Sequence, residues 1–157
     1  MKNTRLVLLG IFFLAVSLSC SLFTAAATST EAPVQNTSPA TNPSGFITSV
    51  TMAKDTQGDQ LDAVNPTTVF GSTDVIHAVV AISGAPDNTV FEAVWNTVDV
   101  GSSNENHTQI DSSQLTAGGT RNLDFTLSPS STWPSGTYDV EIYVNGTLDQ
   151  IVNFSVQ

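Results

Sequence analysis

Residues 133–156, WPSGTYDVEIYVNGTLDQIVNFSV, decide the fold class of this chain. Apolar and polar residues alternate on both sides of Asn145-Gly146. Such alternation indicates half-buried β-strands, because successive side chains of a strand point to opposite faces of a sheet. Asn-Gly between two alternating runs is the strongest short-range signal for a β-hairpin. The residues predicted to face inward are Tyr138, Val140, Ile142 and Val144 in the first strand and Leu148, Val152, Phe154 and Val156 in the second.

The loop length of this hairpin follows from the face on which its apolar residues lie. A two-residue loop at Asn145-Gly146 would put much of the second strand's apolar set on the opposite face, because cross-strand partners share a face. A three-residue loop, Val144 to Gly146, brings both sets together. The pattern therefore predicts a type I turn with Gly146 left-handed in a G1 bulge. Gln150 is the polar residue on the inward parity, and we expect it near a sheet edge.

Shorter alternating runs recur along the chain from residue 45, and no stretch keeps a helical period. Between the runs we expect a polar loop at 54–66, a turn at 84–88 and a crossover at 101–120 with a short strand near Ile110. About seven strands in about 110 residues predict an all-β fold, an antiparallel β-sandwich. The predicted strands before the hairpin are residues 46–53, 67–70, 75–83, 89–100 and 121–127.

The order of these segments resembles the immunoglobulin-like modules of prokaryotic surface proteins and lipoproteins. Three features carry the resemblance: the inward-facing Trp95, the segments FTL at 125–127 and WPSGTY at 133–138, and the final Asn-Gly hairpin. The resemblance covers residues 45–157 and implies an immunoglobulin-like β-sandwich. It also implies that Trp95 packs across the core and that Tyr138 acts like a tyrosine corner. The cysteine pair of antibody domains is absent.

Acidic residues greatly outnumber basic ones in the part of the chain that is predicted to fold. Past residue 30 the sequence has 14 Asp and Glu against two basic residues, Lys54 and Arg121, a net charge of 2 − 14 = −12. Binding to nucleic acid requires Lys and Arg to neutralise phosphates, and docking on anionic lipid requires them too. The composition therefore argues against a nucleic-acid partner. A soluble acidic surface, or adaptation to high salt, accounts for it.

The first 27 residues have the organisation of an export signal. Lys2 and Arg5 give a positive start, an apolar run follows at 6–18, and small residues come next. We therefore expect an exported protein, either at the cell surface or envelope or secreted. Residues 28–44 are rich in Ser, Thr and Pro with almost no apolar content, and we expect a disordered tether there.

Three outcomes of signal processing stay open. The segment SLSC at 17–20 resembles a bacterial lipobox, in which Cys20 would be lipidated, although its Ser and Leu stand in reversed order. Cleavage after Ala27 would release the protein. An uncleaved anchor is the third outcome, since residues 6–27 are uncharged and long enough to span a bilayer. Cys20 is the only cysteine of the chain, so the domain must be stable without a disulfide.

Residue types that carry catalysis are scarce in the predicted domain, which has no Cys and no G-x-S-x-G elbow. His77 falls on a strand with outward parity, and His107 falls in the crossover beside Glu105. We expect both to be ordinary surface residues. Neither a zinc spacing of His and Cys nor another cofactor motif occurs. The sequence therefore predicts no catalytic residue and no cofactor, and the chain is not expected to be an enzyme.

Two weaker site candidates remain. Asp55, Asp59 and Asp62 supply three carboxylates to one loop, and Ca²⁺ prefers such oxygen ligands, but the EF-hand spacing is not met. A solvated turn is the alternative. Trp133 and Tyr143 qualify by position as exposed aromatics for binding a sugar, whereas Trp133 alternatively covers the bottom of the core.

These observations lead to an expected function. The chain would be a non-enzymatic, envelope-associated or secreted module for protein contact or spacing, with a carbohydrate-binding module that uses Trp133 and Tyr143 as the alternative. Its expected partners are the membrane, through an N-terminal lipid or anchor, and another envelope protein or a glycan.

Overall fold

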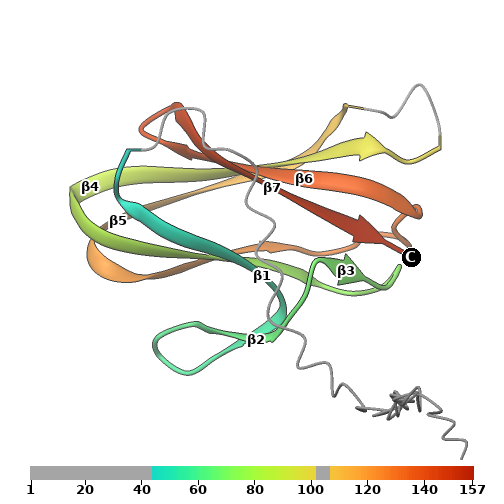
Figure 1. Cartoon of the computed structure of the whole chain (residues 1–157), viewed down its shortest axis with the longest axis horizontal. Helices are drawn as coiled ribbons and strands as arrows, with labels where there is room; N and C mark the ends of the chain where they lie inside the picture. The colour runs from blue at the N-terminus through green and yellow to red at the C-terminus, as the bar shows by residue number, and fades with distance from the viewer. Residues whose placement is uncertain (1–43, 102–106) are drawn as a thin grey trace, which may run out of the picture. The chain divides into compact units, whose positions relative to one another are not determined.

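The computed structural model describes residues 44–101 and 107–157, which contain seven strands and no helix (Figure 1). Within these ranges no helix could therefore serve as a membrane span. The predicted export signal, Cys20 and the tether up to residue 43 lie outside the described residues. The strands are β1 Ile47–Gln57, β2 Asp62–Pro66, β3 Val69–Phe70, β4 Ile76–Asp99, β5 Gln109–Leu127, β6 Gly136–Val144 and β7 Thr147–Val156.

The strands form one hydrogen-bonded sheet that curls around its buried face. Their order is β2-β1-β4-β6-β7-β3, and β5 lies along β4. β1 pairs with the first half of β4, and β6 pairs with its second half. Strands β4 and β5 therefore run through both halves of the sheet (Figure 1). The all-β prediction is confirmed, but the pairing is not purely antiparallel, because β3 runs parallel to β7 and places Phe70 beside Val156.

β4 is one continuous strand, although the sequence predicted two strands separated by a turn at residues 84–88. Its register against β5 shifts twice between Ile82 and Thr89. Gly84 and Asn88 have left-handed φ angles of 63° and 66°, which bend the chain without ending the pairing. The turn residues therefore produce a bend that carries β4 from one half of the sheet to the other.

The predicted crossover at residues 101–120 is also wrong, because β5 begins at Gln109 and stays paired with β4 as far as Leu127. Ile110 belongs to this long strand rather than to a short separate one. The first half of β5 is mostly exposed and rich in Ser, Thr and Gln, since β4 is its one neighbour in the sheet. A strand exposed on both faces shows no apolar alternation, so its sequence does not reveal it. The polar loop predicted at 54–66 likewise contains the end of β1 and all of β2.

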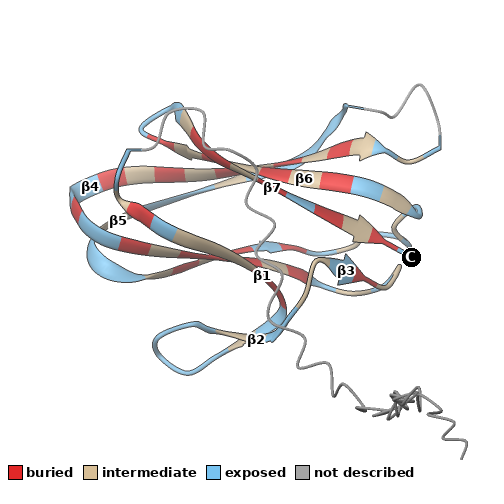
Figure 2. Ribbon diagram, in the orientation of Figure 1, coloured by how far each residue is buried: buried red, intermediate tan, exposed pale blue. Residues whose placement is uncertain are grey.

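The core lies on the inner face of the curled sheet, where buried positions alternate with half-buried ones along β6 and along the second half of β4 (Figure 2). Trp95 and Phe125, both predicted to face inward, are 0% and 1% exposed. Phe154 is the centre of an aromatic cluster: its ring centroid is 5.4 Å from that of Tyr138, 5.7 Å from that of Phe70 and 5.9 Å from that of Trp95. Alternation thus predicted most of this core correctly. Leu148 is the exception: it was predicted to face inward, but it pairs with the outward-facing Tyr143 and is only half-buried.

The β6–β7 hairpin has a different turn from the one predicted. Val144 pairs with Thr147, so the loop has two residues, Asn145 and Gly146, with φ angles of 50° and 79°. Gly146 is left-handed as expected, but the three-residue loop is wrong. The parity of the two strands is restored instead by a bulge at Asp149, which lies between the pairs Tyr143↔Leu148 and Ile142↔Gln150.

The bulge turns two neighbouring polar side chains into the interior. Asp149 is 1% exposed, and its carboxylate accepts a hydrogen bond from the backbone N–H of Ser44. Gln150 is 8% exposed, on a part of β7 that pairs with β6 alone, as expected of a residue near a sheet edge. The extra residue therefore lets Val152, Phe154 and Val156 return to the core side.

Candidate functional site

An open-sided cavity of about 240 Å³ lies where β4 ends, β5 begins and the segment before β6 crosses. Five of its lining residues present mainly apolar surface, and the other four are Ser or Thr. The lining residues are Val100, Ile110, Trp133, Pro134 and Tyr138, with Thr97, Thr108, Ser131 and Thr132. The cavity is close to the size range of small-molecule pockets, which begins at about 300 Å³.

Hydrogen bonds within the protein occupy the polar groups on its inner side. Thr97 N–H donates to the carbonyl oxygen of Thr108 over 2.9 Å, and Thr108 N–H donates to Thr97 Oγ1 over 3.1 Å. Tyr138, 1% exposed, donates its hydroxyl to the carbonyl oxygen of Pro134 over 2.6 Å. Because these groups already have partners, the inner wall offers a ligand mainly carbon surface.

Trp133 forms a half-buried wall of the cavity and packs against the edge of the core, as the structural alternative from sequence predicted. Its backbone N–H donates to the carbonyl oxygen of Ser72 over 2.8 Å. Its indole Nε1–H donates to the carbonyl oxygen of Asp74 over 3.0 Å. Both acceptors belong to the turn between β3 and β4, so this turn holds the ring in place.

Tyr143, the other aromatic candidate, does not line the cavity and lies on the outward-facing side of β6. Its hydroxyl donates to Glu141 over 2.7 Å. This hydrogen bond to Glu141, with burial and nearby acidic side chains, raises the pKa of Tyr143 to about 12. Trp133 and Tyr143 therefore form no common platform on which a sugar ring could stack.

Asp139, on the same side of β6, is half-buried and accepts a hydrogen bond from the Asn96 amide over 2.8 Å. Burial raises the pKa of Asp139, and the negative charge of Glu141 adds to the effect. The Asn96 amide opposes this shift by stabilising the charged form. This side of the sheet therefore carries a carboxylate that is less stable in its ionised form than an exposed one.

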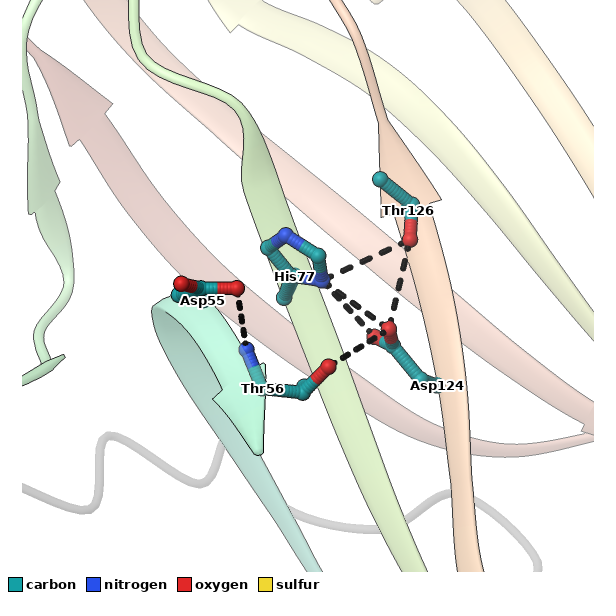
Figure 3. Close-up of polar contacts among 5 residues, drawn as sticks. All are labelled: Asp55, Thr56, His77, Asp124 and Thr126. Carbon is teal, nitrogen blue, oxygen red and sulfur yellow. Dashed lines mark hydrogen bonds and ion pairs between the residues drawn. The ribbon is translucent and has the colours of Figure 1, made fainter. Parts of the chain in front are cut away.

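A second polar cluster surrounds His77 (Figure 3). His77 Nδ1 lies 3.0 and 3.1 Å from the two carboxylate oxygens of Asp124. Asp124 also accepts hydrogen bonds from Thr56 Oγ1 over 3.3 Å and Thr126 Oγ1 over 3.4 Å. The side chains of His77 and Asp124 are only 13% and 15% exposed. His77 is on the outward side, as predicted, but it is part of a packed cluster rather than an isolated surface residue.

This cluster joins three strands, since Thr56 belongs to β1, His77 to β4, and Asp124 and Thr126 to β5 (Figure 3). Asn122 adds a further link by donating to the carbonyl oxygen of Gln60 over 3.0 Å. The hydrogen bonds of this cluster explain why His, Asp and Thr occupy these positions. We therefore assign the cluster a structural role, which is to fasten the β1–β2 hairpin to the sheet.

The calcium candidates do not come together as a site. Asp55 accepts a hydrogen bond from the backbone N–H of Thr56 over 2.8 Å, and Asp55, Asp59 and Asp62 are all exposed. Across residues 44–101 and 107–157, no group of three or more His, Cys, Asp or Glu side chains could hold a metal ion. His107 is exposed, and Glu105 lies outside the described residues.

Sequence reasoning identified Trp133 but missed most of the cavity. Ile110 lies in a polar stretch without alternation, and Val100 ends a strand whose inward side had been assigned to the core. The turn that holds Trp133 precedes it by about 60 residues. No local pattern could have brought these positions together, because they meet only when the sheet curls.

No protein-family model matches the chain, and no curated protein matches it. Among solved structures, it is similar to Pseudomonas fluorescens alkylpurine DNA glycosylase AlkC bound to DNA containing an abasic site analog. The likeness has a TM-score of 0.41 and 16% identity, and it covers 57% of this chain and 28% of that chain. A likeness this low does not extend the activity of that enzyme to this protein.

The function expected from sequence is nevertheless corrected. Neither the family models, nor the curated proteins, nor the structural likeness described above supports a surface module or a sugar-binding module. We therefore withdraw both the non-enzymatic module for protein contact or spacing and its carbohydrate-binding alternative. The positions of Trp133 and Tyr143 agree with the second correction, since one ring forms a cavity wall and the other carries a hydroxyl bonded to Glu141.

Proposed function

We propose that this protein binds a small apolar ligand, the size of one or two aromatic rings, in the cavity beside Trp133 and Tyr138. The observation that carries the proposal is an open cavity of about 240 Å³ whose inner polar groups are already bonded within the protein. A dry apolar cavity of about 150 Å³ is enough to bind benzene. The larger volume here suits a single substituted ring or a fused pair of rings.

The hydroxyl-bearing residues of the lining would orient such a ligand rather than supply most of its affinity. Ser131 and Thr132 are exposed at the surface, whereas Tyr138 is buried. Apolar contact with Trp133, Pro134 and Tyr138 supplies the main favourable term. For indole, which has nine heavy atoms, about 0.5 kcal/mol per atom corresponds to a Kd of about 0.1–1 mM. The proposal includes no catalytic step, in line with the expectation from sequence.

The two tryptophans make a direct test possible. In a ¹⁵N-labelled sample each gives one indole N–H signal, and Trp133→Phe identifies the signal of Trp133. Titration with indole is expected to shift the Trp133 signal saturably and to leave that of Trp95, which is 0% exposed, unchanged. A Trp133 signal that does not move up to about 5 mM indole would show that the cavity does not bind this class of ligand.

A matched pair of variants locates the binding site. Ile110 and Leu115 lie on the same strand, β5, and are 38% and 37% exposed, but only Ile110 lines the cavity. Ile110→Lys is expected to weaken indole binding at least about tenfold, because it places a charge at an apolar wall. Leu115→Lys is expected to leave the affinity unchanged. Equal effects of the two substitutions would place the ligand elsewhere.

We also propose that the curled sheet is an immunoglobulin-like β-sandwich in which β4 and β5 serve both halves. Two features support this proposal. Trp95 lies in the core in edge-to-face contact with Phe154. Tyr138 donates its hydroxyl to the carbonyl oxygen four residues upstream, the type of hydrogen bond that a tyrosine corner makes. An experimental structure with the β4 bend between two packed layers would bear it out.

We also propose that the protein is exported, and this part of the proposal rests only on the sequence of residues 1–27. The positive start, the apolar run and the small residues support translocation, followed by lipidation at Cys20, cleavage after Ala27 or retention as an anchor. The intact mass of the protein from its native membrane or medium distinguishes these outcomes. A diacylglycerol adduct on a chain beginning at Cys20 identifies a lipoprotein, and a chain beginning at Thr28 identifies a released protein.

A further inference from the structure

The turn between β3 and β4, residues 71–74, holds the cavity wall with two of its backbone carbonyls. The Ser72 carbonyl accepts from the backbone N–H of Trp133, and the Asp74 carbonyl accepts from its indole Nε1–H. One bond locates the backbone and the other determines how the ring is rotated. The surface that a ligand would contact therefore depends on the geometry of this turn.

A single carboxylate holds the turn closed. Asp74 N–H donates to the Gly71 carbonyl over 3.1 Å, and Gly71 N–H donates to Asp74 Oδ2 over 2.8 Å. The same oxygen lies 2.6 Å from Lys54 Nζ, on β1. These contacts with Lys54 and then with Gly71 hold the pKa of Asp74 below its usual range, so the carboxylate is charged at neutral pH. Asp74 thus connects the edge strand pair β1–β2 to the turn that carries Trp133.

We propose that Asp74 is a positioning residue of the cavity, and that its ion pair with Lys54 sets the affinity for a ligand through the orientation of Trp133. The second part rests on the proposed function. Without Lys54 the carboxylate is free to leave the Gly71 N–H, the turn opens, and the Asp74 carbonyl no longer stays aligned with the indole N–H. The cavity wall then becomes mobile, and the ligand must order it on binding.

The magnitude follows from the exposure of the pair. The side chains of Lys54 and Asp74 are 42% and 28% exposed, so solvent weakens their attraction. Lys54→Met is expected to weaken indole binding by about two- to fivefold. Asp74→Ala removes the bond to Gly71 as well, and about tenfold weaker binding is expected. Lys54→Arg keeps the charge and is expected to restore most of the affinity.

The experiment measures two quantities in the full chain for each variant. The first is the solvent exchange rate of the Trp133 indole N–H without ligand, compared with that of Trp95. The second is the Kd for indole. Arg121→Met is the matched control, because Arg121 is the other basic residue past residue 30 and does not line the cavity.

Faster exchange of the Trp133 indole N–H in Lys54→Met and Asp74→Ala, with Trp95 unchanged and Arg121→Met like the wild type, supports the positioning role. The positioning role is overturned if the Trp133 indole N–H of Asp74→Ala exchanges at the wild-type rate. It is also overturned if exchange rises equally at both tryptophans, because that indicates a global loss of stability. If exchange responds but the wild type binds no indole, the positioning role stands and the ligand-binding proposal fails. If indole binds equally well to all variants, the control of affinity by Lys54 is refuted.

Discussion

Replacing Tyr138 by Phe removes one oxygen atom from the core and tests whether the Tyr138–Pro134 hydrogen bond holds the segment before β6. The Tyr138 hydroxyl donates to the Pro134 carbonyl over 2.6 Å, and the side chain is 1% exposed. The ring stacks on Phe154 at a centroid distance of 5.4 Å and an interplanar angle of 16°, and phenylalanine preserves this contact.

The expected loss of stability follows from what remains after the substitution. A net contribution of about 0.5–1.5 kcal/mol is typical of a protein hydrogen bond. Pro134 is exposed, so water can reach its carbonyl, and the full penalty of a buried unsatisfied oxygen does not apply. Tyr138→Phe is therefore expected to lower the free energy of unfolding by about 0.5–1.5 kcal/mol. In a domain of this size the Tm falls by about 2–8 °C.

Tyr143→Phe is the matched control, because Tyr143 is the other tyrosine of the chain and donates its hydroxyl to Glu141 on the outer side of β6. Its half-buried position allows water to replace the bond, and a loss below about 0.5 kcal/mol is expected. Guanidinium denaturation of both variants gives the comparison, provided that the m-values match that of the wild type. Equal losses in the two variants would refute the assignment of Tyr138 as the residue that holds this segment.

Three further changes test the charges and the packing around β6. Burial raises the pKa of Asp139, so the stability that its neutral form supplies at low pH is lost as the pH rises through the raised pKa. The Asp139→Asn variant should therefore have a higher Tm than the wild type at pH 7. At pH 3 the two proteins should have the same Tm. Glu141→Gln should lower the pKa of Tyr143 from about 12 toward its usual value. Absorbance titration measures this pKa, and Tyr143→Phe assigns the signal. An unchanged pKa would show that the hydrogen bond to Glu141 is not the main cause of the shift. A Cβ at Gly136 would overlap the Asp99 carbonyl oxygen, so Gly136→Ala should destabilise the fold by about 2–3 kcal/mol in denaturant melts. A loss below about 0.5 kcal/mol would contradict this close approach.

Much of the interior followed from alternation. The parity of residues in 89–100, 121–127 and 138–156 correctly placed Trp95, Phe125 and Phe154 in the core. Asn145-Gly146 correctly marked a tight turn with a left-handed glycine. These features are local: each depends on side chains within one strand or on the conformational freedom of one or two residues.

The exceptions arise where pairing overrides the local pattern. The residues at 84–88 form a bend rather than a turn, because both flanking segments find partners on the same strand, β5. The first half of β5 is a strand despite its polar sequence, because β4 supplies its hydrogen bonds. The bulge at Asp149 supplies the parity change that the sequence pattern assigns to the loop. In each case the deciding factor is a partner strand that no single segment identifies.

The candidate site shows the same division. Trp133 could be selected from sequence as an unusual aromatic residue before a hairpin. Its role as a cavity wall, however, depends on the carbonyls of Ser72 and Asp74. Asp74 lies 59 residues before Trp133 in the sequence. By itself the sequence determined which segments are extended and which of their side chains avoid water. Only the tertiary structure decided the register of the strands, the bend of β4 and the cavity at Trp133, because these depend on contacts between distant segments that form when the whole sheet curls around its core.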